Sequence, residues 1–106
     1  MYLYGQGVPR DGAEAVKWFR MAAEQGYARA QYNLGGMYRQ GIGVTMDGAD
    51  AVKWYGKAAE QGNADALFHL AYMYDNGLGV PKDPAETVNW YRKFAERGGE
   101  VVSQVR

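Results

Sequence analysis

One segment that occurs three times constrains the fold more than any other feature of this chain. It reads AVKWFRMAAEQG at residues 15–26, AVKWYGKAAEQG at 51–62 and, less regularly, AETVNWYRKFAERG at 85–98. Its tryptophans, at positions 18, 54 and 90, are 36 residues apart, and the first two 36-residue units are identical at 20 positions. A fixed internal period of this length indicates a solenoid, in which stacked units share one continuous core.

Each unit has the pattern of two helices joined by a glycine-rich loop. Apolar residues at Ala30, Leu34, Met37 and Tyr38 recur at spacings of three and four, which predicts a helix with one buried stripe. The same pattern returns one period later. We therefore predict a first type of helix, the A helices, over residues 28–40 and 64–76, each ended by a glycine in the left-handed conformation.

The second type, the B helices, is predicted over about 12–25, 48–61 and 84–97. Asp47 and Asp83 are suitable N-caps, and Pro84 favours the first turn of the last helix. The residues expected to be buried are Ala15, Phe19, Ala22 and their equivalents one and two periods later, together with the three tryptophans.

These helices predict an all-α fold, a right-handed superhelix of antiparallel helix pairs. The repeat array is expected to cover residues 1–98, with a partial first unit and further units beginning near residues 37 and 73. Residues 99–106 do not continue the pattern and are expected to form a tail.

The spaced pattern A-x-x-x-L-G-x-x-Y-x-x-G-x-G-V-x-x-D, followed by A-x-x-W-Y-x-K-A-A-E-Q-G, resembles the Sel1-like repeat, a relative of the tetratricopeptide repeat. The matching residues are Ala30, Leu34, Gly35, Tyr38, Gly41, Gly43, Val44, Asp47, Ala51, Trp54, Tyr55, Lys57, Ala58, Ala59, Glu60, Gln61 and Gly62. The third copy departs from it at Ala71, Phe94 and Arg97.

The resemblance implies an adaptor that scaffolds protein complexes, as Sel1-like proteins do in bacterial signalling, secretion and envelope stress. Some cysteine-rich relatives are associated with binding of β-lactams or peptidoglycan. This chain contains no cysteine, which sets it apart from that subgroup.

Composition argues against several other classes of function. Twelve basic and twelve acidic residues leave no positive field for nucleic acid, and no apolar run is long enough for membrane insertion. The G-x-G-V loops follow helix C-termini and lack a G-K-[ST] sequence, so they predict capping turns and not phosphate binding. With one histidine and no cysteine, we expect that the chain binds no metal ion and no cofactor and has no catalytic residues. The compartment stays open.

The candidate binding surface is the side of the A helices that does not face the core, which we name the A-helix face. In repeats of this kind the A helices are expected to line the concave side. Its residues are Arg29, Tyr32, Asn33, Gly36, Arg39 and Gln40 on the first A helix, and Asp65, Phe68, His69, Tyr72, Asp75 and Asn76 on the second. Two alternatives stay open: Tyr32 and Phe68 could instead pack between the helices, and Arg29–Asp65 and Arg39–Asp75 could form ion pairs between units.

From these observations we predict a module that binds a protein or peptide partner through the A-helix face. The alternative is a small-ligand module that binds peptidoglycan or peptide fragments in the same groove, and an enzyme ranks third. We further expect self-association, because the two ends of the array lack the polar outer face of a capping unit.

Overall fold

The structure is a computed structural model, and it describes residues 12–97. Within that range the chain forms helices joined by short loops, and it contains no strand. The helices are α1 (Gly12–Glu24), α2 (Ala28–Gln40), α3 (Gly48–Glu60), α4 (Ala64–Asn76) and α5 (Pro84–Glu96). The two predicted A helices are therefore α2 and α4, and the three B helices are α1, α3 and α5, each within one residue or two of its predicted bounds.

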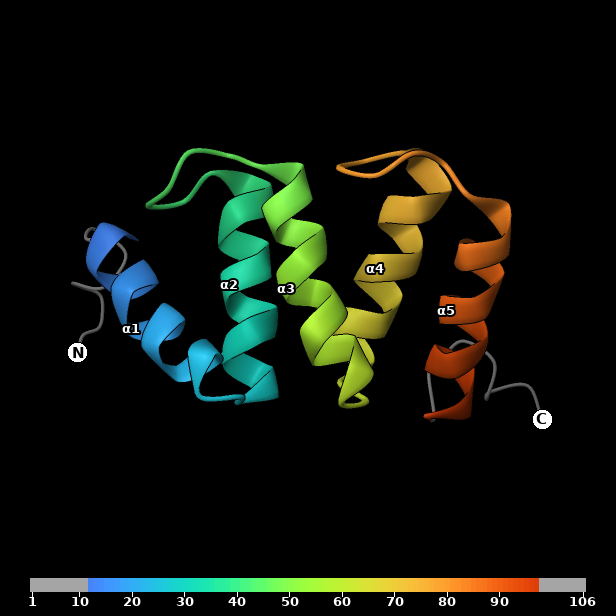
Figure 1. The fold of residues 1–106 in the computed structure, drawn as a ribbon, viewed down its shortest axis with the longest axis horizontal. Coiled ribbons are helices and arrows are strands. Elements are labelled where there is room, and N and C mark those ends of the chain that lie inside the picture. Colours follow the sequence, from blue (N-terminus) through green and yellow to red (C-terminus); the bar gives the residue numbers. More distant parts are fainter. Residues whose placement is uncertain (1–11, 98–106) are drawn as a thin grey trace.

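The helices lie side by side in the order of the sequence (Figure 1). Successive helices run in opposite directions, with the tight turns along one edge of the row (bottom in Figure 1) and the longer glycine loops along the opposite edge. Such an arrangement, in which each element packs mainly on its neighbours in the chain, is that of an all-α solenoid.

The ends of the helices follow from the residues placed there. The Asp47 carboxylate accepts a hydrogen bond from the Asp50 N–H (3.1 Å), and that of Asp83 accepts bonds from two N–H groups of α5, so both predicted N-caps are confirmed. Gly41 has a φ of 72°, in the left-handed region, as predicted for the end of α2. Asn63 is a further N-cap, not predicted from the sequence: its side chain accepts a hydrogen bond from the Ala66 N–H (2.8 Å) at the start of α4.

The core is centred on α3 and α4. Ala51, Tyr55 and Ala58 of α3 are almost completely buried, and Leu67 and Leu70 of α4 pack against them. A second cluster joins α1, α2 and α3 through Val16, Leu34 and Trp54 among others. Of the stripe predicted for α2, Ala30 and Leu34 are buried whereas Met37 and Tyr38 are only half-buried.

The prediction that all three tryptophans belong to the core was wrong for one of them. Trp54 is 6% exposed, whereas Trp18 is 59% exposed and Trp90 is half-buried. The difference lies in position along the row, because α3 has helices packed on both sides within residues 12–97 and α1 has only α2. Phe19 and Ala22 of α1 are likewise half-buried, while their equivalents Tyr55 and Ala58 are buried.

Equivalent contacts connect successive units. The Gln61 side chain donates a hydrogen bond to the Gly26 carbonyl oxygen (2.8 Å), and 36 residues later Arg97 Nε donates to the Gly62 carbonyl oxygen (3.0 Å). At the other end of the helices, a Cβ on Gly43 would come within 2.3 Å of the Gly12 carbonyl oxygen, and a Cβ on Gly79 equally close to that of Gly48. The glycine loops therefore also allow backbones of neighbouring units to touch.

Candidate functional site on the A-helix face

Two adjacent pockets lie on the A-helix face, and Arg39 lines both. The first, of about 190 Å³, lies along α2 and is lined by Tyr32, Asn33, Gly36, Met37, Arg39, Gln40, Ile42 and Tyr55. The second, of about 260 Å³, lies between the two A helices and is lined by Arg39, Phe68, His69 and Tyr72. The structure thus brings eight of the twelve predicted residues together in one hollowed surface.

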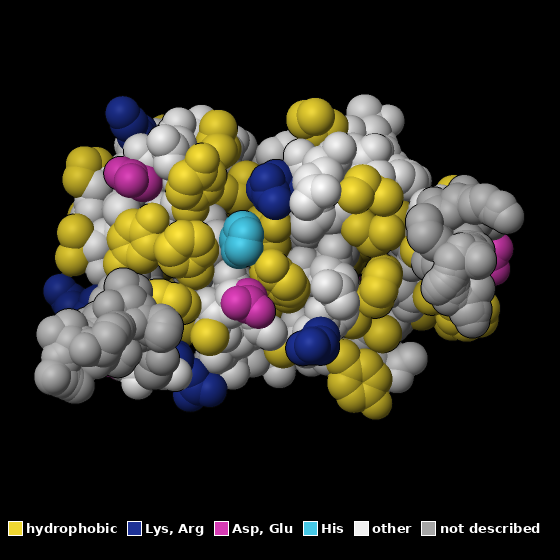
Figure 2. Space-filling view, turned by 180° about the vertical axis from the view of Figure 1, so that it is seen from behind, with side chains coloured by type: hydrophobic (Ala, Val, Ile, Leu, Met, Phe, Trp, Pro, Cys, Tyr) yellow, Lys and Arg dark blue, Asp and Glu magenta, His cyan; other side chains and the backbone are white. Residues whose placement is uncertain are grey.

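Figure 2 shows this face of the molecule, with the single histidine near its centre and hydrophobic side chains on either side of it. Phe68 is 40% exposed and Tyr72 is 44% exposed, and both line the same pocket. An exposed apolar cluster with a few polar groups among it is typical of a surface that binds a partner.

Tyr55, a residue of α3, contributes to this site although it was predicted only as a core residue. Its side chain is 1% exposed, yet its hydroxyl reaches the first pocket and accepts a hydrogen bond from Arg39 Nε (3.1 Å). A Cβ on Gly36 would lie 3.5 Å from that hydroxyl. The tyrosine therefore fixes the position of the one cation that the two pockets share.

The His69 ring is held by aromatic neighbours from three helices. It stacks on Tyr55 with ring centroids 5.4 Å apart, and it meets the edges of Tyr32 (5.5 Å) and Phe68 (5.7 Å). Nδ1 lies 2.9 Å from the Asp65 carbonyl oxygen. A carbonyl oxygen can only accept a hydrogen bond, so the proton is on Nδ1, and in the neutral ring Nε2 is an acceptor.

Tyr32 and Phe68 pack between the helices, which is the alternative that the sequence left open for these two residues. Tyr32 is half-buried and packs against the core cluster of α3 and α4, with its ring 5.6 Å from that of Tyr55. Phe68 contacts both Tyr91 (5.8 Å) and Phe94 (5.4 Å) of α5. These two side chains therefore support the site from behind and still line its pockets.

The remaining predicted residues, Arg29, Asp65, Asp75 and Asn76, are exposed and line neither pocket. The suggested ion pairs between units are not formed among residues 12–97. Arg39 bonds the Tyr55 hydroxyl instead of Asp75, and the Asn76 side chain bonds the Tyr72 carbonyl oxygen within its own helix. A buried acceptor next to Arg39 gives a better bond than a hydrated carboxylate across an exposed surface.

Burial raises the pKa of the Tyr32 hydroxyl, and the nearby Tyr55 and Asp65 raise it further, with a smaller opposing effect of Arg39. The pKa of Tyr91 is also raised, first by burial and then by Asp75 and Tyr72. Both hydroxyls therefore stay protonated at neutral pH and can donate a hydrogen bond to a partner.

In the described part of the chain, no three His, Asp or Glu side chains are grouped so that they could hold a metal ion. Nor does any helix among residues 12–97 have the length and apolar character needed to cross a membrane.

The helix row, the repeat period and the glycine loops define an all-α repeat solenoid of the tetratricopeptide-like class. The model of the Sel1 repeat family matches residues 1–27, 28–63 and 64–99. The chain therefore belongs to the Sel1 repeat family. This match places unit boundaries at Ala28 and Ala64, the first residues of α2 and α4, so that the second and third units each begin with an A helix, which a B helix follows.

Solved structures of Sel1 repeat proteins resemble this fold closely. A Sel1 repeat protein from Oxalobacter formigenes is 45% identical in sequence, with a TM-score of 0.83. The match covers 89% of this chain and 39% of the Oxalobacter protein. A protective antigen of uropathogenic Escherichia coli with an SLR fold is 45% identical with a TM-score of 0.85, over 90% of this chain and 20% of the antigen. Cysteine-rich protein B of Helicobacter pylori is 25% identical with a TM-score of 0.81, over 88% of this chain and 70% of the Helicobacter protein. A comparison with curated proteins gave no match.

The chain thus spans less than half the length of the first two of these structures. Sel1 repeats generally act as scaffolds for protein–protein interaction, and the fold itself is not a catalytic one.

Proposed function

We propose that this chain is a non-catalytic interaction module that binds a segment of a partner protein on the A-helix face of α2 and α4. The observation that carries the proposal is the pair of adjacent pockets joined at Arg39. A partner segment lying across them would place an apolar side chain in each and a hydrogen-bond acceptor at the guanidinium between them.

The size of the pockets favours a protein segment over the small-ligand alternative. Their volumes are about 190 Å³ and 260 Å³. Sites that enclose a whole small ligand have volumes from about 300 Å³ upward. A peptidoglycan or peptide fragment would therefore have to lie across both pockets, past Arg39, whereas each pocket is large enough for one anchoring side chain of a protein segment.

The chemistry of the face also indicates the kind of partner. Tyr32, Phe68 and Tyr72 provide ring surfaces, and Asn33 and Gln40 provide amide groups for main-chain hydrogen bonds. Aromatic residues with adaptable polar groups are common at protein interfaces. A nucleic acid is not an expected partner, because the twelve acidic residues balance the twelve basic ones.

The test is capture of partners from a lysate of the source cells by the immobilised chain and by a triple variant, Asn33→Ala, His69→Ala and Tyr72→Ala. We expect the triple variant to lose the captured protein while its helical circular dichroism remains unchanged. The matched control replaces Lys17, Lys53 and Lys57 with alanine, since these exposed residues lie on the B helices. Capture that survives the triple variant and fails with the lysine variant would place the site on the B helices and refute the proposal.

A further inference from the structure

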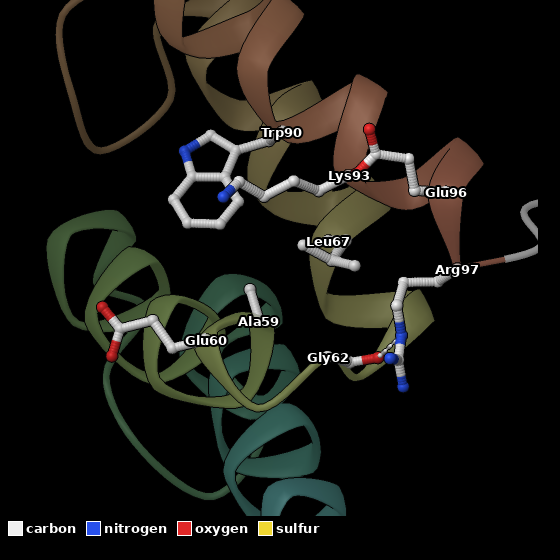
Figure 3. A pocket seen from close by; sticks show the side chains of 8 residues that line it. All are labelled: Ala59, Glu60, Gly62, Leu67, Trp90, Lys93, Glu96 and Arg97. Carbon is white, nitrogen blue, oxygen red and sulfur yellow. Dashed lines mark hydrogen bonds between the residues drawn. The ribbon is translucent and has the colours of Figure 1, made fainter.

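A third and larger cleft lies away from the A-helix face, where α3 ends, α4 begins and α5 ends. Its volume is about 370 Å³, and none of its lining residues lines the two pockets described above. Figure 3 shows Leu67 and Ala59 at its centre, the Trp90 indole on one side and the Arg97 guanidinium on the other. Leu67 is 2% exposed and Trp90 is half-buried, so the floor and one wall are apolar.

The equivalent junction one unit earlier is crossed by a chain of hydrogen bonds. There Gln31 Nε2 donates to the Ala23 carbonyl oxygen (3.1 Å), and Gln61 Nε2 donates to Gln31 Oε1 (3.0 Å). The positions 36 residues later hold Leu67 and Arg97. Leucine has no polar atom with which to bond, so these two side chains do not join across the cleft.

Within residues 12–97, Arg97 has hydrogen-bond donors without an acceptor at the edge of this cleft. Its Nε donates to the Gly62 carbonyl oxygen (3.0 Å), as Gln61 does to Gly26, and its two Nη groups have no hydrogen-bond partner among residues 12–97. Lys93 lies over the Trp90 ring, 5.7 Å from its centroid, and adds a second positive charge. The Glu60 and Glu96 side chains also line the cleft, so its two negative and two positive charges balance, and all four side chains are exposed to water and screened. Recognition of an anion here therefore depends on the hydrogen-bond donors of Arg97 and not on a net positive charge.

We propose that this cleft binds a carboxylate that carries an apolar group. The apolar group would lie on Leu67 against the Trp90 ring, and the carboxylate would accept two hydrogen bonds from the Arg97 guanidinium, whose planar fork matches it. The volume falls in the lower part of the range for small-ligand sites, about 300–1,000 Å³. The same chemistry is found in the C-terminal residue of a peptide with an aliphatic side chain and in a free branched organic acid.

Three probes separate these sources and test the role of the charge. N-acetyl-leucine represents a peptide C-terminus, 4-methylpentanoate represents a free acid, and N-acetyl-leucinamide has the same apolar group with no charge. Binding is followed by the NMR signal of the Trp90 indole N–H, assigned with the Trp90→Phe variant. We expect saturable shifts with a dissociation constant on the order of 1 mM for the acids, and binding of the amide at least roughly tenfold weaker.

The preceding unit provides the matched variants. Leu67→Gln with Arg97→Gln recreates the glutamine pair of the first junction, and it should abolish acid binding while the melting temperature remains near that of the unchanged chain. Arg97→Gln alone keeps a donor for the Gly62 carbonyl oxygen but removes the charge, so it should weaken binding roughly tenfold even if the double variant does not fold. The reverse pair, Gln31→Leu with Gln61→Arg, should create a second site, detected at the Trp54 indole.

Tighter binding of N-acetyl-leucine would identify a peptide C-terminus as the ligand, and tighter binding of 4-methylpentanoate would identify a free acid. Either result supports the cleft as a carboxylate site. Equal binding of acid and amide, or unchanged binding by Arg97→Gln, would overturn the proposal. Because the cleft and the A-helix face share no residue, either proposal can fail without the other.

Discussion

The ring of Tyr55 lies so close to Gly35 that a Cβ at this glycine would be 2.9 Å from Tyr55 Cδ1. This contact lets α3 insert its tyrosine between the A helices, where the ring is 1% exposed and supports His69. One unit later the chain has Ala71 in place of the glycine, and the equivalent Tyr91 is only half-buried. The unit with glycine at this position therefore has the deeply buried tyrosine, and the unit with alanine has the more exposed one.

We predict that Gly35→Ala destabilises the chain, although alanine is the better helix former by about 1 kcal/mol. The added methyl group must displace the Tyr55 ring, and overpacking of this kind costs about 1–3 kcal/mol. The net loss should be about 1 kcal/mol in urea unfolding. Gly36→Ala is the matched control, because its Cβ would be 3.5 Å from the Tyr55 hydroxyl, an ordinary contact. It should be neutral or stabilising, and equal effects of the two substitutions would contradict the argument.

The equivalent tryptophans should differ sharply when each is replaced with alanine. Trp54→Ala removes a side chain that is 6% exposed and should lower the free energy of unfolding by about 3–5 kcal/mol. Trp18→Ala removes one that is 59% exposed, and we expect a loss below about 1 kcal/mol. Chemical denaturation measures the free energy of unfolding of both variants. A loss for Trp18→Ala as large as that for Trp54→Ala would show that Trp18 is buried in solution.

Alkaline pH should weaken the fold through Tyr32. The pKa of this hydroxyl is raised above its ordinary value of 10.0 in the folded chain, mainly by burial. The folded state therefore binds the proton more tightly than the unfolded state, and the resulting stability is complete below pH 10 and lost as the pH rises through the folded pKa. The NMR chemical shift of the Tyr32 ring carbon that bears the hydroxyl, followed as the pH is raised, should change with a midpoint above pH 10. A midpoint at or below 10 would contradict the burial of this side chain.

The period of the sequence was enough to predict the helices, because packing of repeated units leaves few alternatives for a pattern that recurs in register. The face that carries Tyr32, Asn33, His69 and Tyr72 was also predictable, since residues opposite a buried stripe must point outward. The Arg39–Tyr55 bond was not, because helical periodicity says which way a side chain points and not how deeply its neighbour inserts. The cleft at Leu67 and Arg97 was missed for a similar reason. In the sequence, the cleft is indicated only by the replacement of Gln31 and Gln61 with Leu67 and Arg97 one unit later. That replacement is informative only once Gln31 and Gln61 are known to be hydrogen-bonded to each other.

The two outer helices of the described row, α1 and α5, expose apolar side chains, which supports our prediction of self-association. On α1, Trp18 is 59% and Met21 is 50% exposed, and on α5 Val88 is 55% exposed. An apolar surface on α1 and on α5 favours end-to-end pairing of two copies, in which α5 of one chain packs on α1 of the next.

Sedimentation of the 106-residue chain from micromolar to millimolar concentration should show the average mass rising toward that of a dimer or more. Trp18→Glu places a charge on the exposed surface of α1, so it should keep the chain monomeric while the melting temperature changes little. Lys17→Glu changes the charge of the neighbouring exposed position and is the matched control. A single monomeric species over the whole concentration range would mean that these side chains are covered in solution and that the ends do not pair.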